Sequence, residues 1–201
     1  MQRCLGWIVT FTLMAAAAHA ERATTQPGEL ATPKQALKYF DRVGADPHVD
    51  RANLFYHAKS DDEKKVAKAF AAIDLEMARL RKAATARFDS AAGDAMVHAL
   101  RDVTAEDIDN AVEKISGDKA IVSGKRFSEP LPMVRVNGNW KISLSDVLAN
   151  AGSADDLVHM CETLVDSIET IEQEIQADKF ANPSLLERAV KRQVRKVLGP
   201  E

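Results

Sequence analysis

Apolar residues recur at alternating spacings of three and four along two long segments of the chain, which is the spacing of one buried face of an α-helix. Ser60-Asp61-Asp62-Glu63 has the pattern of a capping box and predicts a long helix over residues 61–88. Ser153-Ala154-Asp155-Asp156 predicts the start of a second long helix. The apolar positions of the first are Val66, Phe70, Ile73, Met77, Leu80, Ala84 and Phe88, and those of the second are Leu157, Cys161, Leu164, Ile168, Ile171 and Ile175.

Shorter helices are predicted elsewhere in the first half of the chain. Thr32-Pro33-Lys34-Gln35 combines an N-cap hydroxyl, a proline at the first helical position and a glutamine three residues after the cap, so a helix begins there, and Gly44 ends it. Asp46-Pro47 restarts the chain into a short helix that bears Leu54, Phe55 and Tyr56. Residues 89–110 predict one or two further short helices.

From about Ala111 the pattern changes to short apolar segments separated by turn residues, which predicts β-strands. A hairpin is expected around Asn137-Gly138. A two-residue loop would place Trp140 opposite Arg135, whereas a three-residue loop aligns Trp140 with Val136. We favour the three-residue loop because it gathers the apolar side chains on one face of the sheet. The predicted strands are AVEKIS, KAIVSG, MVRV and WKISL.

A turn at Asn182-Pro183-Ser184 leads into a last helix, so residues 153–201 are expected to form a C-terminal helical hairpin packed on an α+β domain of residues 32–152. The outer face of the last helix is basic. This face either forms ion pairs with the acidic residues of the preceding helix or contacts an acidic partner or an anionic membrane surface. The basic residues are Arg188, Lys191, Arg192, Arg195 and Lys196, and the acidic ones are Glu162, Asp166, Glu169 and Glu172.

Residues 1–20 have the organisation of a secretory signal peptide, with Arg3 before an apolar run and Ala18-His19-Ala20 as the cleavage site. The run is shorter than the roughly 20 residues that a membrane-spanning helix needs. We therefore expect an exported protein, periplasmic or extracellular, that is cleaved near Ala20 and has no transmembrane segment. Residues 21–31 are expected to be a flexible leader, and an uncleaved signal is the alternative.

Cleavage near Ala20 would leave Cys161 as the single cysteine, so no disulfide within the chain is expected. The formal net charge is −3, with acidic and basic residues interspersed. This balance argues against a nucleic-acid partner, because phosphates require a basic surface. No two histidines after Ala20 lie three or four positions apart, as metal ligands on one helical face would, and we predict neither a metal nor a cofactor.

Two parts of the chain, TPKQALKYF near the start and a later stretch that includes MVRVNGNWKI, are similar to small exported domains of the nuclear transport factor 2-like superfamily. The resemblance covers residues 32–43 and 111–147. It implies helices packed into the concave face of a curved antiparallel sheet. The expected fold class is therefore α+β, with helices packed on a small curved antiparallel sheet and a C-terminal helical hairpin. A helical protein with a small sheet appended is the alternative.

Four aromatic residues and a histidine are candidates for the lining of a pocket: Phe40, Phe55, Tyr56, His57 and Trp140. If helices cover the concave face of the sheet, these side chains would meet around a cavity, although we favour ordinary core packing as the explanation of the four aromatic residues. His57 would then lie at the mouth of the cavity, near Asp46 or Asp50. Nothing else in the chain has the pattern of a catalytic nucleophile, and no catalytic residue is predicted.

The resemblance implies no single function, because the superfamily contains isomerases and dehydratases as well as non-catalytic binding and assembly modules. We expect a non-enzymatic exported protein. It would bind either a small apolar ligand in the cone, the space between the helices and the concave face of the sheet, or a protein partner through its apolar helix faces. The alternative is a cone-type isomerase or dehydratase that acts on a small molecule, with His57 and a neighbouring aspartate as acid and base. A homodimer is a further possibility, in which the apolar faces of the helices predicted over residues 61–88 and 153–198 pack against a second copy of the chain.

Overall fold

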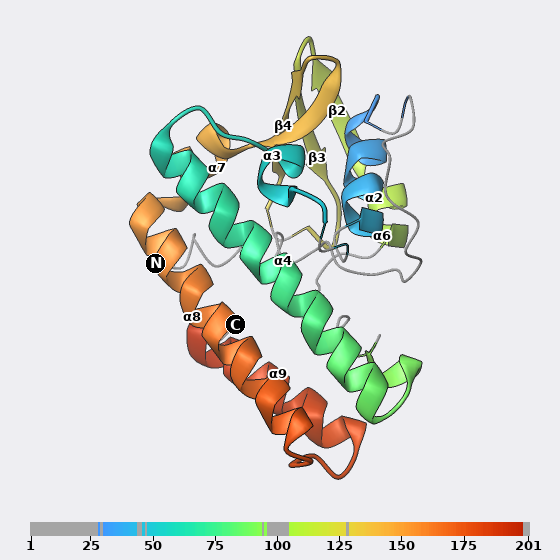
Figure 1. The fold of residues 1–201 in the computed structure, drawn as a ribbon. Helices are drawn as coiled ribbons and strands as arrows, with labels where there is room; N and C mark the ends of the chain where they lie inside the picture. The colour runs from blue at the N-terminus through green and yellow to red at the C-terminus, as the bar shows by residue number, and fades with distance from the viewer. Residues whose placement is uncertain are drawn as a thin grey trace.

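The computed structural model describes most of the chain between residues 28 and 198, and Figure 1 shows the arrangement of its elements. Long helices form one part of the molecule, and a five-stranded sheet with short helices forms the other. The predicted α+β class is thereby confirmed. The predicted signal peptide, the predicted helix end at Gly44 and Pro47 of the predicted restart lie outside the described residues. Within residues 28–198, those not described are 29, 44, 45, 47, 94, 96–104 and 128.

The first described helix, α2 (Pro33–Val43), begins with the predicted capping box. The Gln35 backbone N–H donates to Thr32 Oγ1 at 3.2 Å, and the Thr32 N–H donates to Gln35 Oε1 at 3.1 Å. The next helix, α3 (Arg51–Phe55), begins at Asp50, whose carboxylate accepts from the Asn53 N–H at 3.2 Å. The side chains of Thr32 and Asp50 thus accept from backbone N–H groups in the first turn of each helix, which have no partner within the helix.

Two residues predicted to end helices are not helical: Phe88 is the C-cap that follows α4 (Asp61–Arg87), and Tyr56 lies in a strand. Tyr56 has extended backbone angles and begins strand β1 (Tyr56–His57), which follows α3 directly. The predicted helix is therefore one residue too long, because Tyr56 pairs with Ile142 of the sheet and takes the extended backbone that this pairing requires.

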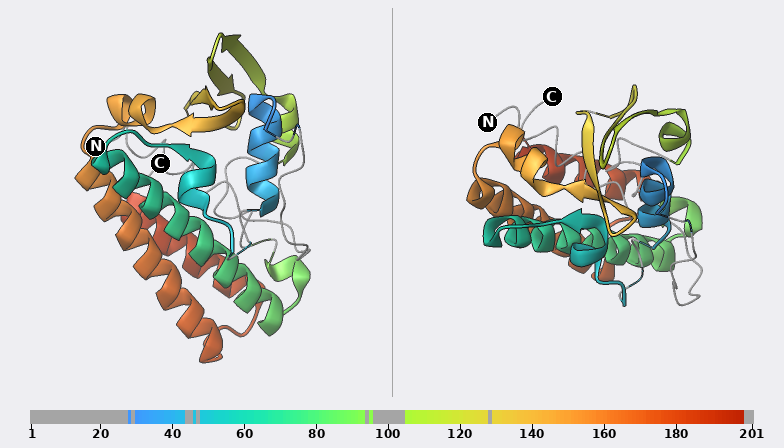
Figure 2. Two further views of the ribbon diagram at one scale, coloured as in Figure 1. Left: turned by 45° about the horizontal axis from the view of Figure 1, so that its top comes forward. Right: turned by 90° about the horizontal axis from the view of Figure 1, so that it is seen from above.

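Three long helices pack together on one side of the molecule, with α9 behind the other two in the left view of Figure 2: α4 (Asp61–Arg87), α8 (Ala154–Gln176) and α9 (Pro183–Leu198). The predicted apolar positions of α4 and α8 are buried, and only Phe88, just after α4, is half-buried. The helices α4 and α8 run parallel to each other (Figure 1), and Arg87 at the end of α4 pairs with Asp178 just after α8, at 2.7 Å. The described residues include no helix that is both long and apolar enough to cross a membrane.

The sheet has the strand order β1-β5-β4-β3-β2. Its last four strands form an antiparallel meander, whereas β1 pairs in parallel with β5 through Tyr56↔Ile142. The sheet is therefore mixed and not wholly antiparallel as predicted, because α3 delivers β1 in the same direction as β5. The meander strands are β2 (Val112–Ser116), β3 (Lys119–Ser123), β4 (Leu131–Val136) and β5 (Asn139–Ser143).

The predicted register of the last hairpin is wrong. Trp140 lies opposite Arg135 across a two-residue Asn137-Gly138 loop. Both loop residues have positive φ angles, 51° and 84°, as the type I′ turn of a tight hairpin requires. The apolar face is completed by Leu131 and Met133, which lie before the valines on which the prediction relied. A three-residue loop is therefore not needed to bury Trp140.

Two more short helices flank the sheet: α6 (Ala105–Asn110) precedes β2, and α7 (Leu144–Ala151) follows β5. The helix α7 was not predicted, because Ser143-Leu144 continues the alternation of β5. Its Leu144, Val147 and Ala151 are nevertheless spaced as one buried helical face. This helix contacts both α4 and β4, and so connects the sheet to the long helices.

Candidate functional site

Four of the predicted pocket residues lie in the hydrophobic core: Phe40, Phe55, Tyr56 and Trp140. The rings of Phe40 and Phe55 are stacked with their centroids 4.4 Å apart, and the Tyr56 ring lies 6.3 Å from that of Phe55. Trp140 donates its indole N–H to the Ala31 carbonyl at 3.1 Å. The structure thus places the Phe55 ring next to those of both Phe40 and Tyr56, and none of the four residues lines the groove described below.

His57 follows the buried Tyr56 on β1 and is half-buried. Burial lowers its pKa, and the positive charges of Lys59 and Lys141 lower it further, while Glu63 acts in the opposite direction. The two aspartates considered as its partners are engaged elsewhere. The Asp50 carboxylate accepts from Asn53, and the Asp46 carboxylate accepts from the His48 backbone N–H at 2.9 Å.

Sequence reasoning missed a buried ionisable cluster between α3, α4 and α8. Asp74 is only 1% exposed, and its charge acts on Arg51, Tyr56 and Cys161. The signal was present, because Asp74 lies four positions after Phe70 and so occupies the apolar face of α4. An aspartate on such a face is rarely left without compensation.

The cluster holds Cys161 and Tyr56 in their neutral forms. Burial, with the Asp74 charge second, raises the pKa of the Cys161 thiol to about 12 and that of Tyr56 well above its usual value. Burial lowers the pKa of Arg51, against the charges of Asp74 and Asp46. A protonated buried thiol and a protonated buried phenol are poor nucleophiles. The cluster is therefore best explained as part of the core.

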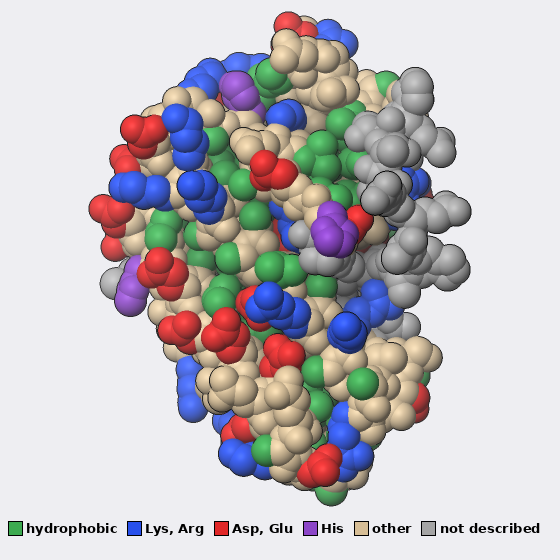
Figure 3. Space-filling view, in the orientation of Figure 1, with side chains coloured by type: hydrophobic (Ala, Val, Ile, Leu, Met, Phe, Trp, Pro, Cys, Tyr) green, Lys and Arg blue, Asp and Glu red, His purple; other side chains and the backbone are tan. Residues whose placement is uncertain are grey.

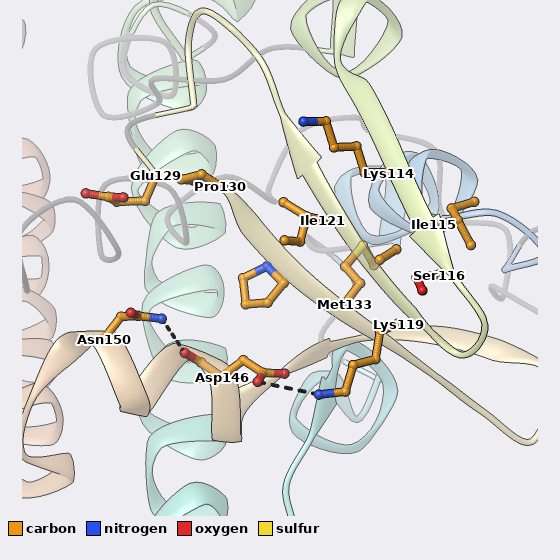
Figure 4. A pocket seen from close by; sticks show the side chains of 12 residues that line it. Lys114, Ile115, Ser116, Lys119, Ile121, Glu129, Pro130, Met133, Asp146 and Asn150 are labelled. Carbon is orange, nitrogen blue, oxygen red and sulfur yellow. Dashed lines mark hydrogen bonds and ion pairs between the residues drawn. The ribbon is translucent and has the colours of Figure 1, made fainter.

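An open groove of about 780 Å³ lies between the outer face of the meander and α7 (Figure 4). The strand register places Lys114, Ile121 and Pro132 in one row across β2, β3 and β4. A second row contains Lys119, opposite Val134. The groove thus has an apolar floor of Ile121 and Pro132 with lysines beside it.

The α7 side of the groove is built around Asp146. One carboxylate oxygen, Oδ2, accepts from Ser143 Oγ at 2.5 Å, and the other lies 3.9 Å from Lys119 Nζ across the groove (Figure 4). Asn150 Nδ2 donates to the Asp146 backbone carbonyl at 2.8 Å. Two further charged residues, Lys114 and Glu129, line the groove, and neither makes an ion pair within the described residues.

Exposed apolar side chains also lie on the two strands at this end of the sheet, with Ile121 on the groove face and Ile115 in the row of Ala120 and Met133 on the other face. Of the four large apolar residues that are exposed among those described, three are on β2 and β3: Val112 (56%), Ile115 (53%) and Ile121 (46%). Folded domains seldom leave such residues clustered on an edge strand, because the cluster invites pairing with another chain.

Strand β2 also presents backbone groups. It is the last strand of the sheet, and no described strand pairs with its outer edge. The turn at Gly117-Asp118 closes on the pair Ser116↔Lys119, and hydrogen-bonded pairs then alternate along the ladder. Glu113 and Ile115 therefore direct their backbone N–H and C=O groups away from β3, on the side where the Glu113 carboxylate accepts from the Lys34 backbone N–H of α2 at 2.6 Å.

No group of three or more His, Cys, Asp or Glu side chains among the described residues is arranged to hold a metal ion. The groove has an apolar floor, charged side chains beside it and the outer edge of β2 next to it. This arrangement is the one best suited to bind another molecule. In comparisons with known proteins, the chain matches no protein-family model, no curated protein and no solved structure.

Proposed function

We propose that the protein is an exported, non-enzymatic binding protein that takes an extended segment of a partner polypeptide along β2 and into the adjoining groove. The observation that carries the proposal is the coincidence of three features at one edge: outward-directed backbone groups, exposed apolar side chains and a groove with an apolar floor. A polypeptide strand offers the matching chemistry, because its own backbone pairs with the edge while alternate side chains enter the groove.

The dimensions agree with this occupant. Strand β2 has five residues, and at about 3.3 Å per residue it would pair with a segment of roughly 16 Å. Lys114 and Lys119 favour an acidic residue in that segment, next to an apolar residue that would cover Ile121. A small apolar ligand fits this site less well, because the groove is open and charged side chains line it, so the ligand would stay partly exposed to water (Figure 4).

The buried helix faces also support this choice of surface. The apolar positions of α4 and α8 pack against each other, and those of α9 pack against α8. These faces are therefore occupied within the chain, and a partner would have to displace a helix to reach them. The proposal rests on the groove and not on the resemblance to any superfamily, and export rests on residues 1–20.

The test uses a displayed library of random dodecapeptides selected on the purified protein. We expect enriched peptides with alternating apolar residues and at least one acidic residue. Their affinity should fall about tenfold or more for Ile121→Asp, which charges the floor, and for Ile115→Pro, which removes an outward backbone donor. Thermal unfolding of each variant, compared with that of the unmodified protein, shows that the loss is not caused by misfolding.

Leu185→Asp is the matched control, because Leu185 is an exposed apolar residue on α9, away from the groove. It should bind the selected peptides as the unmodified protein does. Equal loss with Leu185→Asp, or full binding by a folded Ile121→Asp variant, contradicts the proposal. Amide exchange offers a second readout, because the backbone N–H groups of Glu113 and Ile115 should become protected when peptide binds.

A further inference from the structure

The outer face of α9 is uniformly basic. Its five cationic side chains are exposed and by themselves line a shallow hollow of about 480 Å³. The opposite face of the helix, with Leu186, Ala189 and Val190, is buried against the rest of the hairpin. We call the following residues the α9 basic face: Arg188, Lys191, Arg192, Arg195 and Lys196.

Most of this charge is not neutralised within the described part of the chain. Lys191 pairs with Glu187 one turn earlier at 2.7 Å, and this is the one ion pair that the α9 basic face makes among the described residues. Arg188 Nε donates to the Ser184 carbonyl at 3.3 Å, which leaves its charge uncompensated. The ion pairs with the acidic residues of α8, considered from the sequence, are not formed.

The acidic residues of α8 are directed toward another element. Glu169 and Glu172 lie near Glu76 of α4, where burial and their negative charges raise the pKa of Glu76 against the effect of Arg79. On the face of the molecule formed by α4, acidic and basic side chains are interspersed (Figure 3). The α9 basic face has five cations and one ion-paired carboxylate, so its charge is of one sign, unlike the mixed charge of the surface formed by α4.

The arrangement of the cations is linear. From Arg188 to Lys196 the helix rises by about 12 Å, and the five side chains follow one stripe along it. Leu185, which is 38% exposed, precedes Arg188 by three positions and so lies at the end of the same stripe. A helix that shows solvent a stripe of cations beside an exposed leucine has the chemistry of a contact with anionic lipid headgroups.

We infer that the α9 basic face docks the protein on the surface of a membrane that contains anionic phospholipids. A bilayer is favoured over an acidic protein segment because a protein interface normally has an apolar or aromatic centre, whereas this stripe exposes one leucine. The apolar side of α9 is already buried in the hairpin, so the helix adsorbs without inserting. Binding is therefore electrostatic, reversible and sensitive to salt. It is independent of the groove, which lies on the sheet.

The test is co-sedimentation of the purified protein with vesicles of phosphatidylcholine containing 30% phosphatidylglycerol. We expect binding at about 50 mM salt, loss of most binding at about 500 mM, and none to vesicles of pure phosphatidylcholine. The triple variant Arg188→Glu, Arg192→Glu, Arg195→Glu should bind the anionic vesicles at least about tenfold more weakly, since about three favourable contacts become repulsive. Circular dichroism should show unchanged helix content.

The matched control, Lys68→Glu, Lys82→Glu, Lys125→Glu, makes the same change in net charge at three exposed and scattered positions. It should retain binding within about twofold of the unmodified protein. Absence of binding to the anionic vesicles, or equal loss in both triple variants, overturns the inference. Binding to a soluble polyglutamate peptide but not to the vesicles also overturns it and assigns the α9 basic face to an acidic protein partner.

Discussion

Ser145 Oγ at the start of α7 donates a hydrogen bond of 2.8 Å to Glu63 Oε1 in the first turn of α4. The other carboxylate oxygen of Glu63 accepts from the Lys59 backbone N–H. Ser60 Oγ in turn accepts from the Glu63 backbone N–H at 3.1 Å, as the predicted capping box requires. This buried carboxylate therefore joins the first turn of α4 to α7, the helix that follows the sheet.

We predict that Glu63→Gln lowers the free energy of unfolding by about 1–2 kcal/mol at pH 7, because charge-assisted hydrogen bonds are replaced by weaker ones. Burial opposes ionisation of Glu63, but the bonds from Lys59, Ser145 and Ser60 lower its pKa overall. A group with a lowered native pKa stabilises the fold above its unfolded pKa, about 4.3, and this contribution is lost as the pH falls through the native pKa.

Urea unfolding from pH 7 down to pH 3 checks this prediction. The difference between the two proteins should be largest at pH 7 and should shrink at the acid end. Asp62→Asn, which changes an exposed carboxylate in the same turn, should cost less than about 0.5 kcal/mol. A pH-independent difference would assign the effect of Glu63→Gln to packing instead.

The buried charges of Asp74 and Arg51 should be energetically coupled. Asp74→Asn is expected to destabilise the protein by about 3 kcal/mol, because it leaves the nearly buried Arg51 without its main compensating charge. Arg51→Met should cost a similar amount, and the double variant should cost at least about 1 kcal/mol less than the sum. Chemical denaturation of all four proteins measures the coupling. Additive costs would show that the two groups act separately.

Cys161 should be inert in the native protein. Its thiol is buried, and its pKa of about 12 leaves almost no thiolate at pH 8. In a Cys4→Ser background, iodoacetamide at pH 8 should label Cys161 at least about a hundredfold more slowly in buffer than in 6 M guanidinium chloride. Mass spectrometry follows the labelling. Comparable rates in the two solvents would mean that α8 does not cover this side chain.

The tight turn between β4 and β5 allows a paired test at adjacent positions. Gly138→Ala should destabilise the protein by about 1 kcal/mol, because Gly138 has a φ of +84° and nothing lies within 4 Å of an added Cβ, so the cost is conformational. Asn137→Gly, at a φ of 51°, should be close to neutral. Thermal unfolding of both variants separates the two effects, and equal costs would contradict the type I′ turn.

Helix positions were predictable because periodic apolar residues and caps act locally. Thr32 and Gln35 satisfy each other as the sequence indicates, and every predicted apolar position of α8 is buried. The hairpin register depended on a choice between local signals. The preference of Asn137-Gly138 for a two-residue turn outweighs the alignment of valines, because positive φ angles are costly for most residues and the core is filled by Met133.

The groove could not be predicted in the same way, because it depends on which strand becomes the edge of the sheet. The sequence of β2 does not show that Val112 and Ile115 stay exposed while Ala120 and Val122 on β3 are buried. The placement of α7 beside Ile121 and Pro132 is also a tertiary property. Asp74 is different, since its spacing from Phe70 was visible and could have marked it as buried.

The parallel pairing of Tyr56 with Ile142 has a consequence for the order in which the chain folds. Two-residue turns join β2 to β3 and β4 to β5, so these two hairpins can form within about 10 μs. Strand β1 and helix α4 must instead wait for β5 and α8, which are synthesised much later, and closing such long loops slows folding. A nascent chain of this topology is thus expected to remain without its native core until its last helices are made.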